Sequence, residues 1–120
     1  MQFMILAYET DDAFEARTDP SRSGEYWDSW SGYLQLLGSS SEFVAAGGLL
    51  PPTTATTVRR RDGQRQLQDG PFADSKEHLG GYFVVEVADI DAALVWAERC
   101  PAAAYASVEV RPLLPSSPAM

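Results

Sequence analysis

The residues best suited to chemistry lie between Asp69 and Phe83, where a turn leads through a short charged segment into an apolar stretch. The charged segment holds Lys76, Glu77 and His78, the one histidine of the chain. A lysine can neutralise an anionic group, and a histidine exchanges protons near neutral pH. Asp69 or Glu77 would serve as a general base or would orient a reacting group. This combination favours a pocket for a small molecule beside the segment.

Such a pocket needs both polar groups and an apolar wall. Two simpler interpretations stay open, because His78 alone fits a solvated charged loop and the whole segment fits a purely architectural turn. Under the pocket hypothesis the candidate catalytic residues are Asp69, Lys76 and Glu77. The candidate ligand-binding residues are Tyr8, Trp30, Phe72 and Lys76.

Other kinds of site find little support in the sequence. Cys100 stands beside Pro101 at a predicted helix end, where a structural role is favoured over a nucleophilic thiolate. One histidine and one cysteine, far apart in sequence, do not make a zinc site. The glycine pairs at 47–48 and 80–81 lack the spacing of a dinucleotide-binding fingerprint. The sequence therefore predicts neither a metal nor a cofactor.

Composition narrows the class of protein and of partner. The chain has 120 residues, a net charge of −8 and a sequence pI near 4.4. Nucleic acids and anionic membranes bind through Lys and Arg, so neither is expected as a partner. The local exception is Arg59–Arg61 with Arg65, which fits a solvated edge. A single cysteine excludes an internal disulfide, and the apolar start is too short for a membrane span, so we expect a cytoplasmic protein.

The first half of the chain predicts a strand, a loop and a long helix. Residues 3–8 are apolar at nearly every position, which indicates a strand buried on both faces. Residues 9–17 are acidic and polar and predict a loop. Asp19-Pro20 is typical of a helix start, and aromatic and leucine residues then recur at three- and four-residue spacing to Leu37. The helix should end at Gly38.

The second half alternates strands with a hairpin and one further helix. The Asp62-Gly63 pair is a strong hairpin signal, and Asp89 is suited to capping a helix. The strands are predicted at residues 43–50, 53–60, 64–68, 79–87 and 107–111, and the helix from 90 to about 100. Residues 1–112 should form one domain, followed by a Pro-rich tail at 113–120.

The resulting order, β-α-β-β-β-β-α-β, is a ferredoxin-like βαββαβ plan with an additional β-hairpin, and its fold class is α+β. The central strands of this plan would be 3–8 and 79–87, the two most apolar strands. Two helices cover only one face of the antiparallel sheet, so the other face needs a cover. We therefore expect a homodimer that packs sheet against sheet, as in the dimeric α+β barrels.

Residues 69–82, with the sequence DGPFADSKEHLGGY, resemble the signature of the DGPF-domain branch of the YCII-related proteins. The similarity extends over nearly the whole chain and includes residues 4–8, 55–59 with the 62–63 turn, 96–102 and 108–112. The resemblance implies a ferredoxin-like, dimeric α+β barrel.

The resemblance implies less about activity, since most relatives are uncharacterised. A His–Asp pair is proposed as catalytic in the wider superfamily, but its histidine lies near the first helix, where this chain has none. His78 is not its equivalent, because DGPF proteins commonly have glutamine there. Some DGPF proteins are associated with extracytoplasmic-function sigma factors, which implies a non-enzymatic regulatory role as the alternative to a small-molecule pocket.

Overall fold

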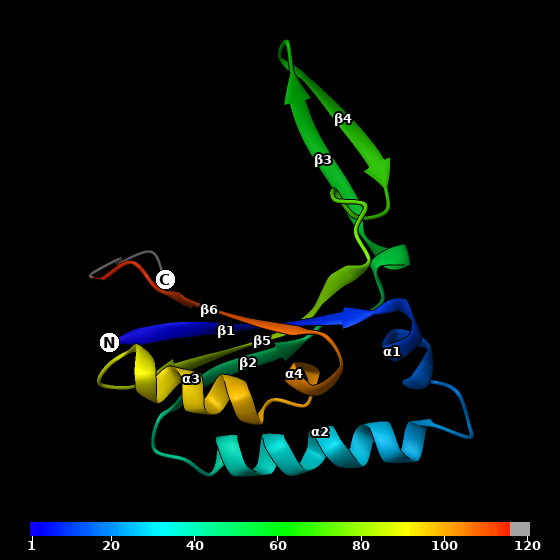
Figure 1. Ribbon diagram of the computed structural model, residues 1–120. Helices are drawn as coiled ribbons and strands as arrows, with labels where there is room; N and C mark the ends of the chain where they lie inside the picture. The colour runs from blue at the N-terminus through cyan, green and yellow to red at the C-terminus, as the bar shows by residue number, and fades with distance from the viewer. Residues whose placement is uncertain (116–120) are drawn as a thin grey trace.

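The computed structural model describes residues 1–115 as a sheet layer, a helix layer and a projecting hairpin (Figure 1). The elements are β1 (Gln2–Thr10), α1 (Asp11–Ala16), α2 (Ser23–Gly38), β2 (Phe43–Gly48), η1 (Pro52–Thr54), β3 (Thr56–Arg61), β4 (Gln64–Asp69), β5 (Glu77–Glu86), α3 (Ile90–Arg99), α4 (Ala102–Tyr105) and β6 (Ser107–Pro112). Residues 116–120 of the predicted tail lie outside this description.

The main sheet is antiparallel and has the strand order β2-β5-β1-β6. β1 and β5 are the two central strands, as predicted from their apolar sequences. A central strand pairs along both of its edges, and a strand that is apolar on both sides needs a cover on both of its faces. The order is that of the ferredoxin-like plan, and the α+β fold class is confirmed. The sheet of the described chain is open at its edges and does not close into a barrel.

Helix α2 carries the predicted aromatic stripe. Its Trp30, Tyr33 and Leu37 are buried in the core, where they meet alternate residues of β1 and β5 such as Ile5 and Phe83. The helix begins at Ser23 and not at Asp19-Pro20. The carboxylate of Asp19 accepts hydrogen bonds from the backbone and hydroxyl of Ser21, which closes a side-chain turn ahead of the helix.

The loop predicted over residues 9–17 is wrong. Glu9 and Thr10 complete β1, and a short helix, α1, follows at once. The Thr10 hydroxyl caps α1 by accepting from the Ala13 amide at 3.1 Å. Six residues are too few to show a helical period, and half of them are acidic, so the pattern carries no helix signal.

The β3–β4 hairpin turns at Asp62-Gly63, as predicted, and both residues have positive φ angles of 53° and 75°. These angles match the tight hairpin turn that an Asp-Gly pair favours. The two strands pair with each other in a separate sheet and rise from the side of the main sheet opposite the helices (Figure 1). The hairpin is therefore an elaboration outside the core.

The last helix and strand lie as predicted, with one addition. Asp89 caps α3 by accepting from the Ala92 amide at 3.0 Å, and β6 pairs with β1. The short helix α4 was not predicted. It follows Cys100 and Pro101 and buries Ala102 against the core. Burial raises the pKa of the Cys100 thiol to about 11, which agrees with the predicted structural role of this cysteine.

The bare face of the sheet, the side without helices, is partly apolar. It carries Met4, Leu6 and Tyr8 of β1 and Tyr82 of β5, all of them half-buried. The ring of Tyr82 lies over Gly47, where a Cβ atom would come within 2.6 Å of it. Among residues 1–115, no helix is long and apolar enough to cross a membrane.

Candidate functional site

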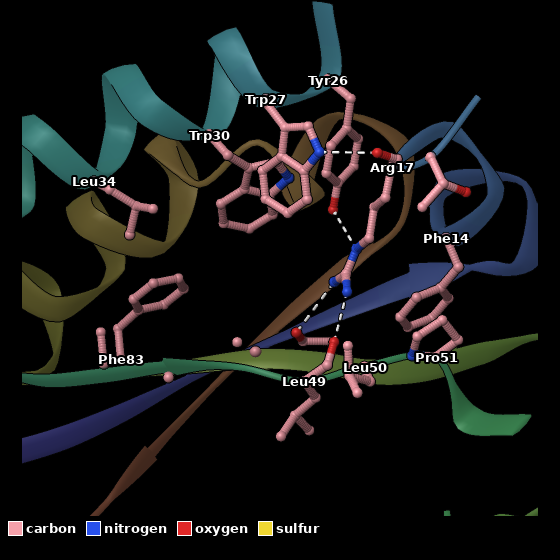
Figure 2. A pocket seen from close by; sticks show the side chains of 16 residues that line it. Phe14, Arg17, Tyr26, Trp27, Trp30, Leu34, Leu49, Leu50, Pro51 and Phe83 are labelled. Carbon is pink, nitrogen blue, oxygen red and sulfur yellow. Dashed lines mark hydrogen bonds between the residues drawn. The ribbon is translucent and has the colours of Figure 1, made fainter. Parts of the chain in front are cut away.

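A cleft of about 560 Å³ lies between α2 and the helix-covered face of the sheet (Figure 2). Its walls come from α2, from β2 and the segment that follows it, and from β5, while the end of α1 closes one side. The lining residues are Phe14, Arg17, Thr18, Tyr26, Trp27, Trp30, Leu34, Ala46, Gly47, Gly48, Leu49, Leu50, Pro51, Gly80, Gly81 and Phe83. Most of this surface is apolar, and its volume suits one small molecule.

The aromatic stripe of α2 serves both the core and the cleft. Trp30 is buried and stacks on Phe83, with the ring centroids 6.0 Å apart and the planes inclined by 21°. Trp27 and Leu34 belong to the same stripe but remain 45% and 41% exposed, because the cleft separates them from the sheet. Their apolar surface is therefore open to a ligand.

Arg17 supplies the polar end of the cleft. It follows α1, and its guanidinium extends across the end of the cleft to the segment after β2, which forms the wall opposite α2 (Figure 2). Nε donates to the hydroxyl of Tyr26 at 3.0 Å, and Nη1 donates to the carbonyl of Leu49 at 2.5 Å. The guanidinium also lies 4.6 Å from the ring centroid of Phe14, within the range of a cation–π interaction. These contacts fix the position of the cation.

Glu9 is the buried counter-ion of Arg17. Its side chain is 1% exposed, and Oε2 lies 2.8 Å from Nη2 of Arg17. Its other oxygen, Oε1, accepts from the hydroxyls of Tyr26 at 2.5 Å and Tyr105 at 2.7 Å. A buried carboxylate is tolerated only when it is paired and hydrogen-bonded, and Glu9 meets both conditions. It holds Arg17 and Tyr26 in place beneath the cleft.

Gly80 makes room for this ion pair. A Cβ atom at position 80 would lie 3.1 Å from Cγ and Oε2 of Glu9 and 3.2 Å from Nη2 of Arg17. The Gly80 carbonyl also accepts from Arg17 Nη2 at 3.3 Å. The first glycine of the 80–81 pair therefore has a packing function. It lets the two charged side chains lie close against β5.

The cleft has a polar end without an unbalanced charge. A guanidinium has five N–H groups. Four of those of Arg17 are taken by Tyr26, Leu49, Glu9 and Gly80 within the described chain, which leaves one on Nη1 for a ligand atom. Because Glu9 offsets the positive charge, the site suits a single neutral oxygen better than a full anion.

The phenols beside Glu9 stay protonated at neutral pH. Burial raises the pKa of Tyr26 to about 12, and the hydrogen bond to Glu9 contributes to the rise. Burial also raises the pKa of Tyr105, and the hydrogen bond to Glu9 again adds to it. Both hydroxyls therefore act as hydrogen-bond donors to the carboxylate at neutral pH, and neither supplies a phenolate base.

These shifts predict a loss of stability in alkali. Tyr26 ionises at its ordinary pKa of 10.0 in the unfolded chain and at about 12 in the folded one. Between these values only the unfolded chain loses the proton, so the free energy of unfolding should fall by about 1.4 kcal/mol per pH unit for each such phenol. Urea unfolding at pH values from 9 to 12 measures this. Tyr26→Phe should flatten the slope, and a wild-type slope equal to that of the variant would contradict the assignment.

A second cavity, of about 430 Å³, lies at the base of the hairpin. Its lining includes Tyr8, Phe72, Glu77 and His78, so a cavity lies beside the 69–83 segment. Asp69 and Lys76 do not line it. Trp30 lines the first cleft, on the other side of the sheet from Tyr8. The predicted set is thus divided between two cavities, and its catalytic assignments stay predictions.

The Leu49–Pro51 segment forms a wall of both cavities. On one side the carbonyl of Leu49 accepts from Arg17, and its amide donates to the Gly80 carbonyl at 2.9 Å. On the other side the same segment faces Phe72 and Glu77. Among residues 1–115, no group of three or more His, Cys, Asp or Glu side chains is placed to hold a metal ion.

Sequence reasoning missed Glu9, Arg17 and Gly80. A signal for Glu9 exists, because it continues the alternation of Phe3, Ile5 and Ala7 and so should face the core. A glutamate at a buried strand position requires a cation, but the sequence does not say which of the nine basic residues provides it. The pairing follows from the turn that brings Arg17 back over the end of β1.

Comparison with known proteins identifies the family and finds similar proteins, among them an uncharacterised relative and a solved structure. The sequence model of the family described as YCII-related domain matches residues 1–117. An uncharacterised protein of Rhizobium meliloti (strain 1021) is 41% identical over 59 residues, and the match spans 48% of this chain and 48% of that protein. The chain thus matches about half the length of this relative.

The solved structure shares the fold of this chain. It is 5-chloro-2-hydroxyhydroquinone dehydrochlorinase from Burkholderia phenoliruptrix AC1100, in complex with 2,5-dihydroxybenzoquinone. The two chains superpose with a TM-score of 0.53 over 95% of this chain and 94% of the other, at 17% sequence identity. The similarity supports the α+β architecture described above.

Proposed function

This chain belongs to the family of YCII-related domain proteins, and on that premise we propose that it binds a small, planar, oxygen-bearing aromatic molecule. The observation that carries the proposal is the cleft between α2 and the sheet, with aromatic walls and one polar end at Arg17. An apolar pocket with few, fixed polar groups is the usual form of a small-molecule site.

The walls favour a flat, unsaturated ring. Trp27 and Trp30 approach from α2, and Phe83 rises toward them from β5 (Figure 2). Aromatic rings gain about 0.5–1.5 kcal/mol from offset or edge contacts in addition to the burial of area. A saturated ring of the same size would bury similar area without this gain, so it should bind more weakly.

The polar end favours an uncharged oxygen on that ring. The remaining Nη1–H of Arg17 can donate to a hydroxyl or carbonyl oxygen, while Glu9 already balances the positive charge. A carboxylate would enter an apolar cleft without a free counter-charge, and it would lose hydration there. A phenol or a quinone carbonyl therefore fits better than an aromatic acid.

The ligand of the similar solved structure belongs to the same chemical class. The ligand in the dehydrochlorinase complex is a six-membered planar ring with oxygen substituents. Since the identity is 17%, that likeness bears on the fold, and the choice of ligand for this chain is argued from its own cleft. The chemistry that the cleft offers such a ligand is polarisation of one oxygen by Arg17.

We further propose that the chain is a homodimer that packs through the bare face of the sheet. Met4, Leu6 and Tyr82 leave apolar surface on that face, and no described element of the same chain covers them. Antiparallel sheets with two apolar faces are stable when both are covered, and a second sheet supplies such a cover at a spacing of about 10 Å.

The ligand proposal is tested by calorimetry and by the indole signals of the three tryptophans. Hydroquinone should bind at least about tenfold more tightly, or about 1.4 kcal/mol, than cyclohexane-1,4-diol or benzoate. In a ¹H–¹⁵N spectrum, hydroquinone should shift the indole signals of Trp27 and Trp30. The indole signal of Trp96 should keep its position in the spectrum, because its N–H donates to Glu42 at 3.0 Å outside the cleft. Tighter binding of benzoate, or equal shifts at all three, would refute the proposal.

A further inference from the structure

We propose that the β3–β4 hairpin is an arm that holds a second copy of this chain against the bare face of the sheet. The inference goes beyond the ligand site and adds a second surface to the proposed dimer. It starts from the position of the hairpin, which leaves the body on the bare-face side and projects away from the helices (Figure 1). A second copy packed on that face would lie alongside the hairpin.

The hairpin has no cover within the described part of its own chain. Every residue of β4 is exposed, and β3 and β4 form a two-stranded sheet of their own. The cross-strand partners Val58 and Leu67 are 61% and 58% exposed, and Phe72 at the base is 76% exposed. An isolated two-stranded hairpin is marginally stable in water, and apolar cross-strand pairs are usually packed against another layer. The arm therefore needs a partner surface.

Charge identifies a second copy as the partner. Residues 56–69 hold four of the nine basic side chains, Arg59, Arg60, Arg61 and Arg65, with two of the seventeen acidic ones. The rest of the chain keeps five basic and fifteen acidic residues, so an arm of charge +2 extends from a body of charge −10. The surface most readily available to a basic arm is the acidic body of another copy.

The length of the arm agrees with this occupant. Each strand has six residues, which span about 20 Å at about 3.3 Å per residue. Two sheets that pack face to face lie about 10 Å apart. The arm therefore reaches past the sheet of the second copy and along its flank. In a two-fold dimer both arms make the same contact, so the surface buried by the arms is doubled.

A nucleic acid is the other candidate occupant of a basic hairpin, and the body argues against it. The charge of −10 on the rest of the chain repels a polyanion over the Debye length of about 8 Å and beyond at low salt. The arginines Arg60 and Arg65 face each other across the strands, where like charges repel. An acidic partner surface would relieve that repulsion.

The test is sedimentation equilibrium of the full chain and of Arg65→Glu. This substitution places opposite charges at positions 60 and 65, so it strengthens the hairpin itself while it removes attraction for an acidic body. We expect the Kd of the dimer to rise by about tenfold. Arg99→Glu makes the same change of net charge on α3, on the side away from the arm, and should leave the Kd unchanged.

A second variant tests the apolar contact. Val58→Ser with Leu67→Ser should also weaken the dimer, while the far-ultraviolet spectrum and the hydroquinone titration stay as in the wild type. If both arm variants dimerise like the wild type, the arm inference fails and the sheet-face dimer stands. A wild-type chain that is monomeric at tens of micromolar would refute both the arm inference and the sheet-face dimer. Salt-sensitive binding of a short DNA duplex by the wild type, lost in Arg65→Glu, would assign the arm to nucleic acid instead.

Discussion

Gly48→Phe is expected to weaken hydroquinone binding by at least about tenfold while the protein stays folded. Gly48 lines the cleft from β2, where it pairs with Gly81, and a Cβ atom added there meets no atom within 4 Å. A phenyl group can therefore enter the cleft without displacing the backbone, and it would occupy the space proposed for the ligand ring. Calorimetric titration of both proteins measures the effect.

Gly32→Phe is the matched control for this substitution. Gly32 is exposed on α2 and does not line the cleft, and a Cβ atom added there also meets no atom within 4 Å. The control introduces the same phenyl group at a helix position, so it reproduces any general effect of added apolar surface. Its ligand affinity should equal that of the wild type. Equal affinities of Gly48→Phe and Gly32→Phe would show that the ligand binds elsewhere.

Glu9→Gln is expected to cost about 3–5 kcal/mol of unfolding free energy, because it leaves the Arg17 cation buried without its partner. The two side chains are 1% and 13% exposed, so water cannot replace the lost carboxylate. For a domain of this size the melting temperature should fall by at least about 10 °C. Thermal unfolding followed by circular dichroism measures the unfolding free energy and the melting temperature. Unfolding followed through the two tyrosines that donate to Glu9 should show the same loss of stability.

Two comparisons isolate the buried pair from a general charge effect. Asp12→Asn removes a carboxylate that is 80% exposed and paired with Arg22, so it should cost no more than about 1 kcal/mol. Glu9→Leu with Arg17→Met replaces both charges by apolar groups and should recover most of the stability lost in Glu9→Gln. If Glu9→Gln were as stable as Asp12→Asn, the ion pair would not hold the end of the cleft together.

Most of the fold is predictable because its signals are local. The central strands 3–8 and 79–87 show themselves by nearly unbroken apolar sequence, the hairpin by Asp62-Gly63, and α2 by its aromatic spacing. The exceptions are the short helices α1 and α4, which have too few residues to establish a period. The start of α2 differs because Asp19 uses its carboxylate in a turn with Ser21 instead of a cap.

The cleft was less accessible to prediction because its parts meet only in the folded chain. Glu9 and Arg17 lie in a segment predicted as a loop, and Gly80 lies far from both along the chain, so their connection depends on how α1 turns back over β1. The residues proposed from sequence included Tyr8 and Trp30 as one wall. They lie on opposite sides of the sheet, since Tyr8 alternates with the inward-facing Glu9 while Trp30 lies on the helix side. Residue type indicated a pocket for an anionic group at Lys76, whereas the cleft at Arg17 favours a neutral oxygen, and residue type did not indicate the side of the sheet.

The Leu49–Pro51 wall is shared by the two cavities, which provides a physical route for coupling between them. The segment bounds the cleft on one side and the cavity at the hairpin base on the other, so an occupant of one cavity that displaces it alters the shape of the other. An occupant on either side then changes the free energy of occupying the other, and by thermodynamic reciprocity it does so by the same factor in both directions. Such a displacement would couple occupancy of the cleft to the DGPF segment.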